Sequence, residues 1–158
     1  MAAEIIVQAP NEQGTEFHRA FWGMFVDEAE KNPAFMEEFK RLINCQRAYF
    51  GLTVGVPRIS ITLTLRTKEK RVGFGIYFTK ALEEYREFEK HSDAVEREIH
   101  ETCPDCEFQW RPCTSNAALR CFVDADVARM PKGDWPTLAR QLRGYALLMK
   151  QIIQRYLA

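Results

Sequence analysis

The sequence has no excess of charge of either sign and no long apolar run. Lysine plus arginine and aspartate plus glutamate both number 22 in a chain of 158 residues, so no overall field draws the protein toward nucleic acid or an anionic membrane. The first residues, MAAEIIVQAPNEQG, lack the basic start and apolar stretch of a signal peptide. No segment reaches the run of about 18 apolar residues that a membrane helix needs. We therefore predict a cytoplasmic protein that does not enter membranes.

The common catalytic motifs are absent from the sequence as well. It contains no GxSxG elbow, no phosphate-binding glycine loop, no HExxH pair and no dinucleotide fingerprint. Two expected central strands, ISITLTL and VGFGIYF, hold neither the carboxylates nor the lysine of a nuclease site. The histidines His18, His91 and His100 fall on or beside charged helices, where we expect solvated side chains. We therefore predict no catalytic activity and no cofactor.

No composition shift marks a boundary between domains. Glycine, serine and proline form no tracts, and the chain has no internal repeat. Hydrophobic residues make up 46% of the chain, enough to bury a core without disulfides. We expect residues 1–14 to form a polar lead-in and residues 15–158 to form a single domain.

Alternating runs predict the strands. AYFGLTVG, RISITLTLR and RVGFGIYF place apolar residues at every second position, which is the period of a strand. The joins GVP and TKEK are short, so these runs are expected to form antiparallel hairpins. Two more alternating runs, CEFQWR and ALRCFVD, follow later in the chain.

Helical spacing of apolar residues predicts the remaining elements. Thr15 is expected to cap a first helix, and Pro33 fits the first turn of a second, shorter one. A further helix is expected from Lys80 to about Glu101, and a long last helix after its expected cap, Asp134. The order α-βββ-α-ββ-α predicts an α+β fold, with a single antiparallel sheet of about five strands and helices packed on one face.

The stretch CPDC, from Cys103 to Cys106, suggests a metal site or a redox pair. His100, Cys103, Cys106 and Cys113 are enough ligands for structural zinc, but their spacing differs from the two close ligand pairs of a typical zinc site. Strand parity also turns Cys106, like Cys121, into the core. The pair precedes a strand, whereas a thioredoxin-like pair opens a helix. We therefore predict thiols and no bound metal.

Charge is segregated along the chain despite the net of zero. Between Lys40 and Arg71 there are eight basic residues and one acid, Glu69, whereas the helix expected at 80–101 is rich in glutamate. These basic residues either balance acids within the fold or on a partner subunit, or they contact phosphates. The candidate binding residues come from this segment and from the polar face of the sheet: Arg47, Tyr49, Lys68, Lys70, Arg71, Tyr77, Arg111 and Arg120.

Several stretches resemble a known bacterial family, the domain of unknown function 4268. They are AYFGLTVG, ISITLTLRTKEKRVGFGIYF, AVEREI, FQWRP, NAALRCFVDADV and the DWP that opens the last helix, with FWGMF resembling the family's aromatic entry helix. Members of that family often follow a restriction-endonuclease-like domain, so the resemblance implies a link to DNA handling or defence. The family has no assigned activity from which functional residues carry over.

Two functions remain from these observations. The first is a non-catalytic binding or assembly module that forms a homodimer or contacts another protein. The alternative is an accessory domain that binds nucleic acid weakly through the basic segment 40–71 and the exposed sheet face. Salt separates the two, because phosphate contacts release counterions whereas apolar burial does not.

Overall fold

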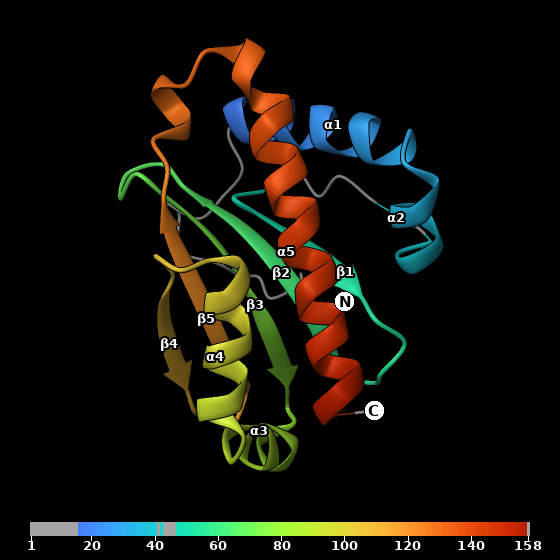
Figure 1. Ribbon diagram of the computed structural model, residues 1–158, viewed down its shortest axis with the longest axis vertical. Helices are drawn as coiled ribbons and strands as arrows, with labels where there is room; N and C mark the ends of the chain where they lie inside the picture. The colour runs from blue at the N-terminus through green and yellow to red at the C-terminus, as the bar shows by residue number, and fades with distance from the viewer. Residues whose placement is uncertain (1–15, 41, 43–46, 158) are drawn as a thin grey trace.

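The computed structural model describes residues 16–40, 42 and 47–157 (Figure 1). Five strands form one antiparallel sheet in the order β1-β2-β3-β5-β4. The strands are β1 Tyr49–Thr53, β2 Ile59–Arg66, β3 Arg71–Thr79, β4 Glu107–Arg111 and β5 Asn116–Asp124. Each lies on one of the five runs whose period of two predicted a strand.

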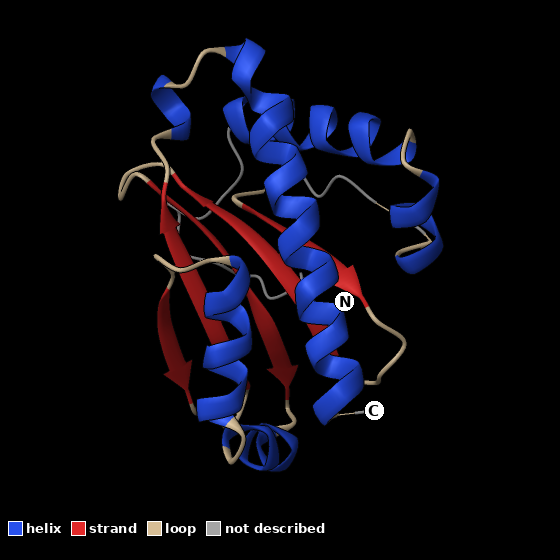
Figure 2. Ribbon diagram, viewed as in Figure 1, coloured by secondary structure: helices blue, strands red, loops and turns tan. Residues whose placement is uncertain are grey.

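Five helices accompany the sheet (Figure 2). They are α1 Glu16–Glu30, α2 Pro33–Glu38, α3 Leu82–Glu89, α4 Ser92–Thr102 and α5 Trp135–Tyr156, with short 3-10 turns η3 Val127–Arg129 and η4 Lys132–Asp134 before α5. None of these helices is long and apolar enough to cross a membrane.

The helices pack on the apolar face of the sheet, and ring contacts show how. Trp22 of α1 lies 5.2 Å from Phe50 of β1, measured between ring centres. Tyr145 of α5 stacks on Phe74 of β3 at 4.3 Å. In Figure 1, α4 and α5 lie in front of the sheet. The predicted α+β fold class, with a single antiparallel sheet, is therefore confirmed. The predicted lead-in at 1–14 and the predicted cap Thr15 lie outside the described residues.

Two predicted helix features were wrong. The helix expected from Lys80 to Glu101 is two helices, because the chain turns at Lys90 and His91, where the His91 N–H bonds the Phe88 carbonyl in a tighter i→i+3 turn. Asp134 stands at the start of α5, but its side chain makes no capping hydrogen bond.

The expectation that all three histidines are solvated was wrong for His18. Its side chain is only 5% exposed, although His91 and His100 are exposed as predicted. His18 lies on α1 beside the fully buried Phe21, and the neighbouring ring of Phe17 meets its imidazole edge-on. Helical spacing sets His18 next to the apolar stripe of α1, and the packing of α1 against the rest of the fold buries the His18 side chain with that stripe.

Candidate functional site

The predicted binding residues on the sheet lie on its polar face, opposite the side on which the described helices pack. Strand pairing sets the side chains of this face in rows that run across the sheet. The rows are Tyr49, Thr64, Gly73, Phe122 and Glu107; then Gly51, Thr62, Gly75, Arg120 and Gln109; then Thr53, Ser60, Tyr77, Ala118 and Arg111. The part of the face over β3, β5 and β4 carries the arginine and aromatic contacts.

Tyr77 and Arg120 are the first pair on this face. Arg120 on β5 donates from Nη2 to the hydroxyl of Tyr77 on β3 at 2.6 Å, and its guanidinium lies 5.5 Å from the ring centre. Gly75, which pairs with Arg120, lets β3 and β5 lie this close together. A Cβ at that position would lie only 2.2 Å from the Leu119 carbonyl oxygen. The structure thus brings two of the predicted binding residues into direct contact.

Phe122 is the centre of a second cluster, and it is not among the binding residues predicted from the sequence. The guanidinium of Arg71 lies 4.4 Å from the ring centre of Phe122, and that of Arg66 lies 5.1 Å away. Gly73 lies across the pairing from Phe122, and a Cβ there would come within 3.0 Å of the ring. The signal for Phe122 was present, because it shares strand parity with Arg120.

Carboxylates neutralise both arginines of this cluster. Arg71 bonds Glu107 at 2.7 Å and Glu69 at 3.4 Å, and Arg66 bonds Glu69 at 3.1 Å. Both guanidiniums are therefore already paired with anions. At this site the basic residues therefore balance acids within the fold, which is one of the alternatives given for the basic segment.

The other predicted binding residues lie apart from these clusters. Tyr49 is on edge strand β1, and Arg111 is on the opposite edge strand, β4. Arg47 precedes the sheet, and its carbonyl accepts a hydrogen bond from Trp22 Nε1 at 2.7 Å. Lys68 and Lys70 are exposed in the turn between β2 and β3. The eight predicted residues therefore do not form one continuous site.

Strand β4 forms one edge of the sheet and pairs with β5 alone among the described strands (Figure 1). Its sequence, EFQWR, exposes Glu107, Gln109 and Arg111 on the polar face. Phe108 and Trp110 point to the other face and are half-buried, and Trp110 donates from Nε1 to a Glu96 carboxylate oxygen at 2.7 Å. This edge is the place where a further strand can add to the sheet.

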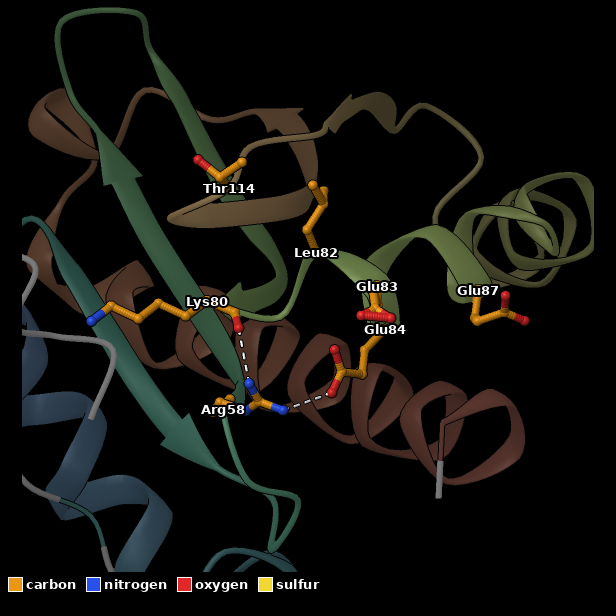
Figure 3. A pocket seen from close by; sticks show the side chains of 7 residues that line it. All are labelled: Arg58, Lys80, Leu82, Glu83, Glu84, Glu87 and Thr114. Carbon is orange, nitrogen blue, oxygen red and sulfur yellow. Dashed lines mark hydrogen bonds and ion pairs between the residues drawn. The ribbon is translucent and has the colours of Figure 1, made fainter.

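An open hollow of about 450 Å³ lies at the end of the sheet near α3 (Figure 3). Arg58 donates there to the Lys80 carbonyl oxygen at 2.9 Å and to the Glu84 carboxylate at 2.8 Å. Lys80 points its side chain away from the glutamates, and Glu83 and Glu87 complete an acidic wall. The guanidinium of Arg58 therefore links the start of β2 to α3. The hollow offers no convergent set of groups for a ligand.

The structure does not bring together the four residues considered for zinc. His100 Nε2 lies 3.3 Å from the Cys106 carbonyl oxygen, whereas the exposed Cys113 lies beyond the far end of β4, where its sulfur is 3.4 Å from the Ser115 hydroxyl. Cys106 and Cys121 are buried, as strand parity predicted. Across the part of the chain that is described, no group of three or more His, Cys, Asp or Glu residues is arranged to hold a metal ion.

Comparison with known proteins identifies the family. A family model described as a domain of unknown function (DUF4268) matches residues 17–157. The chain belongs to the DUF4268 family. The match confirms the resemblance found in the sequence, and it covers every helix and strand except the first residue of α1. No curated protein and no solved structure matches the chain, so the function of this DUF4268 domain has to be inferred from its own surfaces.

Proposed function

We propose that this DUF4268 domain is a non-catalytic assembly module that forms a homodimer by pairing β4 with β4 of a second copy. The observation that supports the proposal is that Glu107–Arg111 is complementary to itself. When two copies of EFQWR run antiparallel about an axis through Gln109, Glu107 faces Arg111 of the second copy. Phe108 then faces Trp110 of the second copy, and both relationships occur twice.

Each of these cross-strand pairs is a favourable one. Opposite charges and aromatic pairs directly across two antiparallel strands stabilise the pairing, and like charges in the same places destabilise it. The half-buried Phe108 and Trp110 carry apolar surface that a second strand would cover. The backbone groups along the edge that have no strand partner among the described residues would gain one as well.

The carboxylate of Glu107 is suited to a second contact. Its side chain is 75% exposed although one oxygen already bonds Arg71. A carboxylate accepts several hydrogen bonds, so Glu107 can keep Arg71 and still meet Arg111 of the second copy. The dimer then joins two five-stranded sheets, and its polar face carries the Arg66–Phe122–Arg71 and Tyr77–Arg120 contacts of both copies.

Weak nucleic-acid binding is the second candidate function, and Lys68 and Lys70 favour it. Both are exposed in the β2–β3 turn, and neither forms an ion pair within the described residues. Tyr77 and Arg120 carry flat groups of the kind on which bases stack, but both are half-buried and bonded to each other. Because Arg66 and Arg71 are already paired with carboxylates, we expect this binding to be weak. The link to DNA handling or defence implied by the family resemblance belongs to this candidate.

A charge exchange on β4, followed by sedimentation at several protein concentrations, tests the assembly. Arg111→Glu puts glutamate opposite Glu107 twice in the dimer, so we expect the dimer dissociation constant to rise about tenfold or more. The double variant E107R/R111E restores opposite charges across the pairing, so we expect it to dimerise better than Arg111→Glu, but less well than the wild type because it also loses the Arg71–Glu107 bond. Lys68→Glu, a charge change away from β4, serves as the control. A wild type that stays monomeric, or an Arg111→Glu variant that dimerises unchanged, contradicts the proposal.

A further inference from the structure

Three of the five cysteines meet where α4 ends and β4 begins. Cys103 directly follows α4, Cys106 lies three residues later, and Cys121 is in β5; their exposed fractions are 3%, 6% and 0%. The thiol of Cys106 donates to the Glu107 carbonyl oxygen, with sulfur and oxygen 3.6 Å apart, and the thiols of Cys121 and Cys103 lie close enough to hydrogen-bond its sulfur. The Cys103 thiol donates in turn to the Tyr145 hydroxyl, with sulfur and oxygen 3.7 Å apart. This cluster has no part in the proposed assembly.

The three thiols differ in how readily they ionise. Hydrogen bonding from the Cys121 thiol, helped by the Cys103 thiol and the Phe122 backbone N–H, lowers the pKa of Cys106 in spite of burial. Burial raises the pKa of Cys103 and raises that of Cys121 well above its usual range. Cys106 is also the thiol that contacts both of the others. Because the thiolate is the reactive form, Cys106 is the best placed of the three to act as the nucleophile.

Backbone geometry selects Cys103 as the partner of Cys106. The Cys106 N–H bonds the Cys103 carbonyl oxygen at 3.2 Å, which closes a turn over Pro104 and Asp105. The first and last Cα atoms of such a turn lie within about 7 Å, and disulfides span about 4.4–6.8 Å between Cα atoms. This pair can therefore close a disulfide without moving the sheet.

Cys121 is less well placed for a bond. It pairs with Phe108, so Cys106 is its diagonal neighbour two residues along. Diagonal neighbours in antiparallel strands are about 7–8 Å apart, beyond the usual disulfide range. Its thiol contact with Cys106 therefore points to the role of hydrogen-bond donor.

We propose that Cys103 and Cys106 form a reversible disulfide when a small hydroperoxide oxidises Cys106, with Cys121 as a positioning residue that donates a hydrogen bond to the Cys106 sulfur. The Cys106 thiolate attacks one oxygen of hydrogen peroxide, the O–O bond breaks, and the leaving hydroxide takes up the thiol's proton as water. The Cys103 sulfur then attacks the Cys106 sulfenic acid, the S–O bond breaks, and a second water leaves. Two thiols and one peroxide thus give one disulfide and two waters.

Burial fits an oxidant of this size. Pro104 and Asp105 are exposed between the two buried cysteines, so the sulfurs lie just below a surface turn. Oxidation also removes the hydrogen that Cys103 donates to Tyr145, a residue that stacks on Phe74 in the core. Oxidation of the dithiol therefore changes a hydrogen bond to α5.

Peptide mapping tests the proposal in the full chain with Cys45 and Cys113 changed to serine. The protein is treated with hydrogen peroxide, and free thiols are alkylated. A protease that cuts before Asp105 then separates Cys103 from Cys106, and trypsin, which cuts after Arg120, separates Cys106 from Cys121. We expect two peptides joined by a disulfide that dithiothreitol releases, with Cys121 alkylated. A link between Cys106 and Cys121, a Cys106 oxidised beyond sulfenic acid beside a free Cys103, or an unreacted pair overturns the proposal.

Two substitutions at position 121 test the donor. Cys121→Ala removes it, and we expect disulfide formation at neutral pH to slow about fivefold or more, because less of Cys106 is thiolate. Cys121→Ser keeps an O–H donor in the same place and is expected to react at close to the starting rate. Equal rates in the two variants would show that Cys121 has no such role. Both variants are compared by their rate of disulfide formation, which does not depend on dimerisation. The test therefore stays valid even if the β4–β4 dimer does not form.

Discussion

The Arg71 guanidinium and the Glu107 carboxylate lie 2.7 Å apart, although they come from β3 and β4, which are separated by β5. The Arg71 side chain crosses over Phe122 of β5 to make this bond. The contact ties the edge strand back to the middle of the sheet and holds Glu107 at the edge. That position is the one from which Glu107 would meet a second copy.

Two glycines with opposite surroundings test the account of the sheet. Gly75→Ala would place its Cβ 2.2 Å from the Leu119 carbonyl oxygen, so we expect the free energy of unfolding to fall by about 2 kcal/mol or more. Gly144→Ala lies in α5, where a Cβ meets nothing within 4 Å, and we expect a gain of about 1 kcal/mol. Urea unfolding at one fixed protein concentration measures both. A Gly75→Ala variant as stable as the wild type would show that β3 and β5 are not so close.

Stability should depend on the protonation of His18. Burial lowers the pKa of His18 from its usual 6.5, partly offset by a hydrogen bond to the Leu65 backbone. The unfolded chain therefore takes up this proton first, so the stability is complete above about pH 6.5 and is lost as the pH falls through the lowered pKa.

Substitution of this histidine checks the sign. His18→Gln should flatten the loss of unfolding free energy between about pH 7.5 and about pH 5.5, whereas His91→Gln, at an exposed position, should leave it unchanged. The slope against pH is the readout, since His18→Gln also alters packing. A wild type with no slope in this range would contradict a buried neutral His18.

The sheet could be predicted from the sequence because one rule, the period of two, assigns every strand residue to a face. The same rule placed Tyr77 and Arg120 together, and applied further it would have found Phe122. It did not show that Arg66 and Arg71 are paired with Glu69 and Glu107, because those bonds depend on strand order.

The helix break and the buried histidine were harder to predict, for physical reasons. Phe88 and Val95 are seven residues apart, a spacing that fits one continuous helix as well as two, so apolar periodicity does not reveal the turn at Lys90. His18 is polar by type and was assigned to the surface, but it borders the stripe of Phe21 and Phe25 that α1 buries. The thiol cluster depends on β5 lying beside β4, which no local pattern specifies.

Cys113 is expected to be the most reactive of the described thiols. Backbone N–H groups of Asn116 and Ser115 and the Ser115 hydroxyl lower the pKa of Cys113 to about 7. Alkylation followed by mass spectrometry should therefore show modification of Cys113 rising with pH around a midpoint of about 7. Cys121, whose pKa burial raises, should react far more slowly. Equal rates at the two sites, or a midpoint near the usual value for cysteine, would refute this.

Nucleic-acid binding is expected to be weak and sensitive to salt. Each phosphate contact releases counterions, so affinity for DNA should fall steeply between about 50 mM and about 200 mM salt, and Lys68→Glu/Lys70→Glu should weaken it on all sequences alike. The same double variant should leave the dimer intact, because neither lysine is on β4. Tight binding near physiological salt that the double variant abolishes would favour the nucleic-acid function over assembly.

A single cysteine on the proposed two-fold axis tests the central claim most directly. Gln109→Cys, in a chain whose Cys45 and Cys113 are serine, would set two thiols opposite each other in the β4–β4 dimer, so a short bis-thiol crosslinker should give a covalent dimer in high yield. Lys68→Cys in the same background, exposed but away from β4, is the matched control and should stay monomeric. Crosslinking of Gln109→Cys at no more than the rate of the control would contradict assembly through this edge.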